Sequence, residues 1–380
     1  MIPTRSVPDV LLRARDLVSP ALRRAVRTLS PELRPLAEYH LGWCDADGRA
    51  VAGADSGKGI RPALAVLSAE AVGVPGAVGV PGAVAVELVH NYSLIHDDVV
   101  DEDTERRHRP TVWALYGVGR AVIVGDALVA LAQQVVLDPH GTCLADGVGA
   151  VGAVDDGVLL PAGETGPGTP GGADRLGSFS LGAGARAARC IADANAAMIA
   201  GQALDMAFES VPVVDVAGCL AMEAGKTGAL LACASAIGAI LGGADSATVA
   251  SLTTYGMELG LAFQAVDDLL GIWGDPGVTG KPAWSDLRQH KKTLPVAAAL
   301  GEGGPEAEEL ASLLASEHLE ESQVARAAHL VEICGGRQSA IEEADRRLAS
   351  ALRAIEEASI DPKAAAELAD VARFVVDREH

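Results

Sequence analysis

The sequence predicts an all-α protein that forms a single domain over residues 1–380. Apolar residues recur with the helical period along most of the chain, and no segment alternates with period two for long. Turn signals are too sparse for a sheet. Aromatic residues make up only 3% of the chain, whereas Ala, Gly, Leu and Val abound. This composition favours helices that pack closely through small side chains.

The first predicted helices lie between residues 10 and 39, where arginines are interspersed with Leu and Val in one or two amphipathic helices. This arginine density is also found in transit peptides. Asp9, Asp16 and Glu32 argue against that interpretation, because transit peptides contain few acids. Helices that each begin at a proline follow at 62–72, 81–101 and 110–136.

The second half of the chain predicts helices at 183–209, 213–241 and 247–273, followed by several shorter ones between 285 and 378. Residues 227–243 form a charge-free run. The run is just shorter than a usual membrane span and is rich in Ala and Gly, so we expect a buried core helix and no transmembrane segment.

Residues 138–182 interrupt this pattern, because they are crowded with Gly, Pro and Asp. Such a segment has too little apolar surface to offset the entropy lost on ordering. Long loops in compact domains are either disordered or functional. We expect a flexible insertion between two helices here, in preference to a lid or a docking element.

Composition excludes some functions and suggests a compartment. The formal net charge of −21 argues against nucleic acid as a partner, because phosphate backbones require a basic surface. The start of the sequence has no apolar stretch of the secretory type. Six scattered cysteines contain no CxxC pair, which indicates neither a zinc site nor a disulfide framework and favours the cytoplasm. They are Cys44, Cys143, Cys190, Cys219, Cys233 and Cys334.

Two aspartate clusters in apolar surroundings are the main functional signal. The first is Asp97-Asp98-Val99-Val100-Asp101, and the second is Asp267-Asp268. Asp97 and Asp101 are spaced i, i+4 and therefore share one face of a helix. Buried carboxylates are costly without a cation between them. Magnesium fits this role, because it binds one or two carboxylates together with substrate phosphates.

Basic residues accompany the aspartates at several points in the chain. Taken singly, each is most simply a solvated surface side chain. Taken together, they predict anion sites beside metal sites, as diphosphate groups held by magnesium and by Lys or Arg would require. The basic positions are Lys58 and Arg61 at a helix start, Arg106 and Arg107, Lys226 at a probable kink, Lys281, and Lys291 and Lys292.

In this order the motifs resemble those of the polyprenyl (isoprenyl) diphosphate synthase family, most closely the bacterial geranylgeranyl diphosphate synthases. The matching region runs from Gly57 to Pro295. The motifs are Gly57-Lys58-x-x-Arg61-Pro62, Asp97-Asp98-x-x-Asp101, Arg106-Arg107, Gly201-Gln202-x-x-Asp205, Lys226-Thr227 and Phe263-Gln264-x-x-Asp267-Asp268.

The resemblance implies a helical bundle of the isoprenoid synthase type around a large central cavity, in a homodimer. It implies magnesium-dependent condensation of isopentenyl diphosphate with an allylic prenyl diphosphate. The allylic carbon–oxygen bond breaks, isopentenyl diphosphate attacks the cation, and a proton is lost, in this family to the departing diphosphate. Cations placed on the leaving group stabilise its negative charge, and a dry cavity protects the carbocation.

The resemblance also implies individual roles. The pocket for isopentenyl diphosphate is expected from Lys58, Arg61, His90 and Arg107. Asp97 and Asp101 would hold two magnesium ions against the allylic diphosphate, and Asp267 a third. Arg106, Lys226, Gln264 and Lys281 would contact the allylic diphosphate, and Asp98 would orient an arginine. Thr227 and Gln202 would lie near the reacting carbons.

The second aspartate motif departs from the family pattern. It reads Asp267-Asp268-Leu269-Leu270-Gly271, so the last aspartate of the family is absent. Asp275 lies one turn further along and is a weak candidate to replace it. If the first aspartate provides most of the ligation, the loss is tolerable, although it would weaken the third metal site.

Product length is partly encoded just before the first aspartate cluster. Tyr92 lies five residues before Asp97 and Ser93 lies four before it. In the resembled family, a single aromatic residue at this place implies a C20 product. We therefore expect geranylgeranyl diphosphate as the main product, with Tyr92 as the floor of the elongation cavity; plain core packing is the alternative role for Tyr92.

Two other functions remain open at this point. A terpene cyclase on the same bundle would ionise a prenyl diphosphate without an isopentenyl partner, and would not need Lys58, Arg61, His90 and Arg107. A non-catalytic regulatory subunit usually loses the first aspartate motif, which is intact here, but Gly271 keeps that interpretation open.

Overall fold

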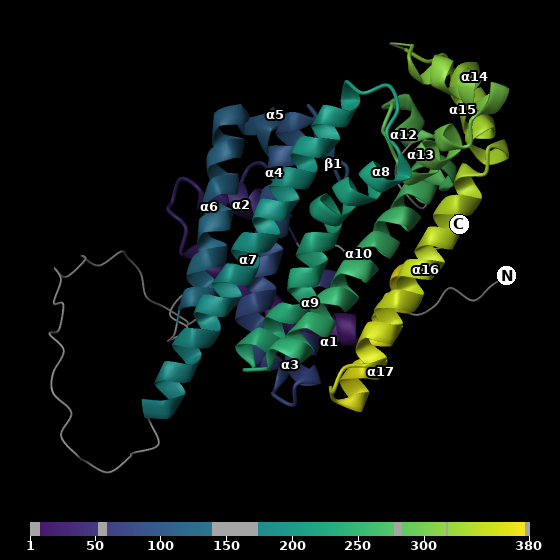
Figure 1. Ribbon diagram of the computed structural model, residues 1–380. Helices are drawn as coiled ribbons and strands as arrows, with labels where there is room; N and C mark the ends of the chain where they lie inside the picture. Colours follow the sequence, from purple (N-terminus) through teal and green to yellow (C-terminus); the bar gives the residue numbers. More distant parts are fainter. Residues whose placement is uncertain (1–7, 52–58, 139–173, 277–282, 317, 377–380) are drawn as a thin grey trace, which may run out of the picture.

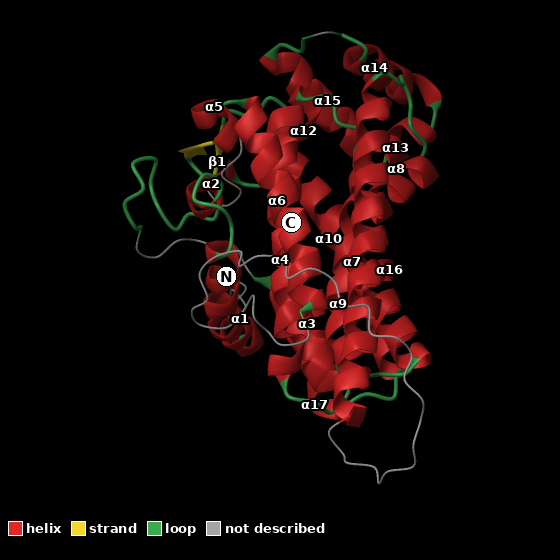
Figure 2. Ribbon diagram, turned by 90° about the vertical axis from the view of Figure 1, so that its left-hand side faces the viewer, coloured by secondary structure: helices red, strands yellow, loops and turns green. Residues whose placement is uncertain are grey.

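The computed structural model consists almost entirely of α-helices, and it confirms the all-α prediction (Figures 1 and 2). It describes residues 8–51, 59–138, 174–276, 283–316 and 318–376. The first helices are α1 (Asp9–Arg27), α2 (Arg34–His40), α3 (Ile60–Ala71), α4 (Val80–Val100), α5 (Val112–Tyr116) and α6 (Val118–Leu137). The next are α7 (Asp174–Glu209), α8 (Val216–Glu223), α9 (Ala229–Leu241) and α10 (Ser246–Trp273). The last are α12 (Ser285–Arg288), α13 (Leu294–Gly301), α14 (Gly304–Leu314), α15 (Glu321–Ile333), α16 (Gly336–Glu356) and α17 (Pro362–Val376).

The long helices run side by side, with α4, α7, α9, α10 and α16 forming the body of the bundle in Figure 1. The C-terminal end of α4 leads into a small antiparallel hairpin, β1 (Glu105–Arg106) and β2 (Arg109–Pro110). In both views this hairpin lies at the same end of the bundle as α8 and α12. That end collects most of the residues discussed below.

Three expected helices differ from the observed ones, and one hairpin was not expected. The expected 110–136 helix breaks at Gly117, whose φ of 86° is left-handed, so α5 and α6 are separate. Helix α7 begins at Asp174 rather than at residue 183, within the expected insertion; residues 139–173 of that insertion lie outside the described part of the chain. The expected 213–241 helix contains a π-helix at Ala224–Gly228. The 105–110 hairpin was not expected.

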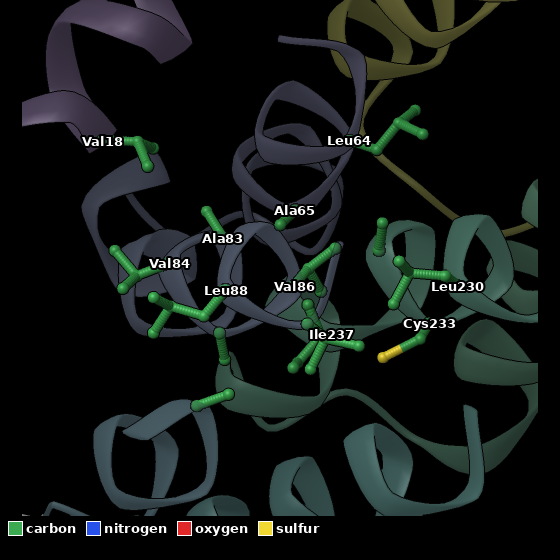
Figure 3. Close-up of a cluster of buried hydrophobic side chains, with 14 of the residues drawn as sticks. Val18, Leu64, Ala65, Ala83, Val84, Val86, Leu88, Leu230, Cys233 and Ile237 are labelled. Atoms are coloured by element: carbon green, nitrogen blue, oxygen red, sulfur yellow. The ribbon is translucent and has the colours of Figure 1, made fainter. Parts of the chain in front are cut away.

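The core is formed by small and aliphatic side chains from α1, α3, α4 and α9 (Figure 3). Leu88 and Ile237 are fully buried there. Helices α3 and α9 approach so closely that a Cβ atom at Gly238 would overlap the carbonyl oxygen of Ala65. The backbone N–H of Gly238 donates to Ser68 Oγ at 3.0 Å across this contact. The helices therefore pack closely through small side chains, as the composition predicts.

Within the described residues, three helical stretches are long and apolar enough to cross a membrane by length and composition alone: Gly76–Val100, Val118–Leu137 and Val216–Leu241. The first and third are mostly buried inside the bundle. The part at 227–241 that falls in the charge-free run is core, as expected. In contrast, Val118–Leu137 keeps exposed apolar side chains, including Val118 and Ile123.

Candidate active site

The acidic end of α4 forms the first part of the candidate site. Asp97 is partly buried on the last turn of α4, and Asp101 is the exposed C-cap residue one turn later. Burial raises the pKa of Asp97, with further contributions from the negative charges of Asp101 and Asp205, although Lys226 opposes this shift. The two carboxylates predicted to act together therefore lie close enough to repel each other.

Lys226 faces these carboxylates from the π-helix. Its Nζ atom lies 2.5 Å from Asp205 Oδ2 on α7. Burial alone would lower the pKa of Lys226, but the charges of Asp205, Asp97 and Asp101 raise it, so the ammonium group stays charged. The predicted kink is thus a π-helix, a feature often found at functional sites.

Glycines set the position of this π-helix between its neighbours. A Cβ atom at Gly201 of α7 would overlap the backbone nitrogen of Lys226. On the other side, a Cβ atom at Gly260 of α10 would lie 2.7 Å from Gly228 Cα. Such close approaches are possible only without a side chain. The π-helix is therefore clamped between α7 and α10.

A chain of hydrogen bonds links the π-helix to the second aspartate motif. Thr227 Oγ1 donates to Gln264 Oε1 at 2.8 Å, and Gln264 Nε2 donates to Asp268 Oδ1 at 2.8 Å. The backbone N–H of Leu294 donates to Asp268 Oδ2 at 2.8 Å. Burial raises the pKa of Asp268 to about 7. Asp268 thus holds Gln264 and the start of α13 in place. Its neighbour Asp267 is partly exposed on α10.

A second, basic group lies between α3, α4 and the hairpin. Arg61 Nη1 lies 3.4 Å from His90 Nε2. Burial and the positive charges of Arg61 and Arg107 lower the pKa of His90 well below its ordinary value, so the imidazole is neutral. Arg106 Nε donates to Asp98 Oδ1 at 2.6 Å. The structure therefore pairs Asp98 with an arginine, as the resemblance implied.

The hairpin holds Arg107 in an unusual backbone conformation. Arg107 and His108 have φ values of 52° and 58°. Both central residues of a two-residue hairpin turn adopt positive φ in the type I′ geometry, which normally favours Asn or Gly. A non-glycine residue in this region costs of order 1–3 kcal/mol. Strain of this kind is typical of functional segments.

The side chains expected to limit product length lie beneath the acidic centre. Tyr92 is buried and packs edge-on against His96, with ring centroids 4.9 Å apart. His96 Nε2 lies 3.1 Å from the carbonyl oxygen of Val122 on α6. A Cβ atom at Gly125 would overlap the His96 ring. Ser93 Oγ donates to the His90 carbonyl oxygen at 2.8 Å.

In the second aspartate motif, the space beside Gly271 is occupied by a side chain from another helix. A Cβ atom at Gly271 would overlap the carboxylate of Asp286, a buried residue of α12. Asp286 is also close enough for its charge to contribute to the raised pKa of Asp268. Asp275, the replacement considered from sequence, is exposed beyond the end of α10.

Two expected site residues, Lys58 and Lys281, lie outside the described residues. Gln202 is on α7, where its Oε1 atom has no hydrogen-bond partner in the described part of the chain. Three residues near the site are not predicted by the sequence. Asp205 lies in the Gly201-Gln202-x-x-Asp205 motif, and its spacing after Gln202 is the available signal. Asp286 has no such signal, nor does His40 at the end of α2, whose charge contributes to the lowered pKa of His90.

The donor chemistry of the acidic centre fits magnesium. Asp97, Asp101 and Asp205 are acidic oxygen donors that repel one another, and a divalent cation would relieve that repulsion. Among the described residues, no three Asp, Glu, His or Cys side chains are grouped closely enough to hold a metal ion by themselves. This arrangement suits a cation that is shared with substrate phosphate oxygens.

Known proteins are similar to this chain in sequence and in fold. Residues 51–331 match the family model described as polyprenyl synthetase. A (2E,6E)-farnesyl diphosphate synthase of Mycobacterium tuberculosis is 42% identical over 380 residues, covering 99% of this chain and 94% of the relative. A geranylgeranyl diphosphate synthase of the same organism is 41% identical over 354 residues, covering 93% and 90%. The crystal structure of polyprenyl synthetase from Streptomyces coelicolor A3(2) has a TM-score of 0.83 and 45% identity, covering 98% of this chain and 100% of that chain.

Proposed function

This chain belongs to the polyprenyl synthetase family, a family of prenyltransferases of isoprenoid biosynthesis, and from that premise we propose its reaction. The enzyme condenses isopentenyl diphosphate head-to-tail with an allylic prenyl diphosphate. The observation that carries the proposal is the acidic centre of Asp97, Asp101 and Asp205 around Lys226, next to the basic group of Arg61, His90 and Arg107. One part suits a metal-bound leaving group and the other suits a second diphosphate.

Each part of the site has a defined task in this reaction. Magnesium held by Asp97 and Asp101, and by Asp267 from α10, would neutralise the diphosphate that leaves the allylic carbon. Lys226 and Arg106 contact the same leaving group, and Arg106 is oriented by Asp98. Gln264 is hydrogen-bonded to both Thr227 and Asp268, so the π-helix and α10 are connected at this point.

The second diphosphate binds about two turns earlier along the same face of α4, because His90 lies seven residues before Asp97. Arg61 and Arg107 provide the positive charge there, and Lys58 belongs to the same pocket in this proposal. His90 is neutral and can donate an N–H without adding charge. Isopentenyl diphosphate held here presents its double bond to the allylic carbon, and the departing diphosphate then takes the proton.

The proposed product is geranylgeranyl diphosphate. Tyr92 and His96 close the space below Asp97, and Ser93 is small. A farnesyl and a geranylgeranyl diphosphate synthase are similar to this chain at nearly equal identity, so a C15 product is the competing outcome.

The chain acts as one domain and as a cytoplasmic homodimer in this proposal. Helix α6 supports the dimer, because Val118, Val122 and Ile123 are exposed on its outer surface. Five described cysteines are free thiols, which suits a reducing compartment. The self-complementary contact of a two-fold dimer would bury these side chains against a second copy.

The decisive experiment combines purified protein with magnesium and isopentenyl diphosphate, and separately with dimethylallyl, geranyl or farnesyl diphosphate. Product masses then give the chain length, with C20 expected. Asp101→Ala should abolish turnover, whereas Glu102→Gln, its exposed neighbour, should not. Hydrocarbon from geranylgeranyl diphosphate alone would identify a cyclase. No turnover by the isolated chain would support a regulatory subunit.

A further inference from the structure

A cavity of about 190 Å³ opens beside the basic group, on the side of α4 that faces the hairpin. Leu94 and Asp98 of α4 line it, together with Arg106 and Arg107 of the hairpin. His40 lines the opposite wall, at the C-terminal end of α2. Arg106 is paired with Asp98 there, so an anion in the cavity would meet Arg107 and His40.

His40 belongs electrostatically to the same group as His90. Burial and the positive charges of Arg106 and Arg107 lower the pKa of His40 to about 3, although a side-chain hydrogen bond with Asn91 opposes this shift. In turn, His40 is one of the groups that lower the pKa of His90. A neutral imidazole carries one N–H donor and one acceptor nitrogen. His40 is therefore able to donate to a phosphate oxygen without adding a charge to the arginines.

The wall that carries His40 is held firmly against the hairpin. Tyr39 Oη donates to the Pro110 carbonyl oxygen at 2.7 Å. Arg109 Nη2 donates to the Cys44 carbonyl oxygen at 2.7 Å, and its guanidinium lies 4.3 Å from the centroid of the Tyr39 ring. These contacts fix the end of α2 relative to Arg107. A donor placed on such a fixed wall loses little entropy when it binds a ligand.

We propose that His40 is a further binding residue for the homoallylic diphosphate, donating an N–H to a phosphate oxygen in the pocket of Arg61, His90 and Arg107. This inference rests on the proposed function, since it assumes that the pocket accepts isopentenyl diphosphate. It assigns His40 to that substrate alone. The allylic diphosphate lies with Lys226 on the other side of Asp97.

The test compares His40→Ala with His40→Gln and with a control, His329→Ala. His329 is exposed on α15 and does not line the cavity. For His40→Ala we expect the KM for isopentenyl diphosphate to rise about tenfold, the loss of one hydrogen bond to a charged group. The KM for the allylic substrate and kcat should stay unchanged. His40→Gln retains an N–H donor and should recover part of the affinity, and His329→Ala should match wild type.

Direct binding separates this inference from the proposed function. Isothermal titration of isopentenyl diphosphate into each variant needs no turnover, so weaker binding by His40→Ala supports the site even if the reaction proves different. If wild type binds and His40→Ala binds equally well, the role of His40 is overturned and the function stands. If wild type does not bind isopentenyl diphosphate at all, both fall.

Two further readouts separate a binding role from a structural or cationic one. Equal loss of affinity for both substrates, together with a lower melting temperature, would mean that His40 only supports the fold. Binding measured between pH 6 and pH 8 should show a constant ratio between wild type and His40→Ala. A ratio that grows as the pH falls would mean that the ring binds as a cation, which would overturn the neutral-donor assignment.

Discussion

The carboxylate of Asp286 occupies the space into which a side chain at Gly271 would project. Gly→Ala within a helix normally stabilises by about 1 kcal/mol. At this position we expect the opposite sign, because the added methyl group overlaps a buried carboxylate. Gly271→Ala should lower the free energy of unfolding by about 1–3 kcal/mol, the usual cost of overpacking. Gly271→Asp should cost more, since it adds a charge beside Asp286 and Asp268.

Urea unfolding of single and double variants measures this coupling. Asp286→Ala should relieve the overlap, so the double variant Gly271→Ala/Asp286→Ala should be more stable than the sum of the single changes implies. Strict additivity would show that the two positions do not compete for space.

Lys226 and Asp205 should act as a coupled pair in catalysis. Removing the ammonium group by Lys226→Ala leaves Asp205 and Asp97 without their compensating charge and removes a donor from the leaving diphosphate. We expect kcat to fall by about 10²–10³. In a double-mutant cycle with Asp205→Ala, the two losses should not add. Lys363→Ala, an exposed lysine on α17, is the control and should retain full activity.

Tyr92→Ala should lengthen the product. The change removes the ring that packs against His96 and opens the space below Asp97. Mass spectrometry of products made from farnesyl and geranylgeranyl diphosphate would then show chains beyond those of wild type. Tyr255→Phe is the matched control, because Tyr255 is buried against α17 and bonds the Leu368 carbonyl oxygen. An unchanged product distribution in Tyr92→Ala would leave Tyr92 as core packing.

The stability contribution of His40 should depend on pH. Its native pKa of about 3 lies below the ordinary value of 6.5, so the unfolded chain binds the proton more tightly. Stability is therefore full above pH 6.5 and is lost as the pH falls towards 3. Relative to His40→Gln, wild type should lose about 2 kcal/mol between pH 7.5 and pH 5. If wild type and His40→Gln lose stability in parallel over this range, the native structure does not resist protonation of the His40 ring.

The dimer proposal predicts different effects for two exposed isoleucines. Ile123 on α6 is 56% exposed and Ile333 on α15 is 51% exposed. Ile123→Asp places a charge in the proposed interface and should yield monomers in sedimentation experiments. Ile333→Asp changes α15, which lies on the opposite side of the bundle from α6 in Figure 1, and should leave the mass unchanged. If both variants sediment like wild type, the interface lies elsewhere.

The helices were predictable because their apolar positions recur with period 3.6, and the aspartate clusters because their spacing is local. The 105–110 hairpin escaped prediction because Arg107 and His108 carry no turn signal; only the surrounding structure holds them at positive φ. Asp286 and His40 escaped because each meets its partners across a large separation in sequence. Asp205 was within a visible motif, but its role depends on where the π-helix places Lys226.

The π-helix at Ala224–Gly228 makes the length of this segment as important as its composition. The i→i+5 bonding of a π-helix places one more residue in the turn than an α-helix has. Deleting one of these five residues would therefore restore a regular helix and leave α8 and α9 in nearly the same register. The bulge that brings Lys226 to Asp205 would be lost. Sequence drift in this part of the chain is thus confined to substitutions, because a change in residue number removes the catalytic geometry even where the core is kept.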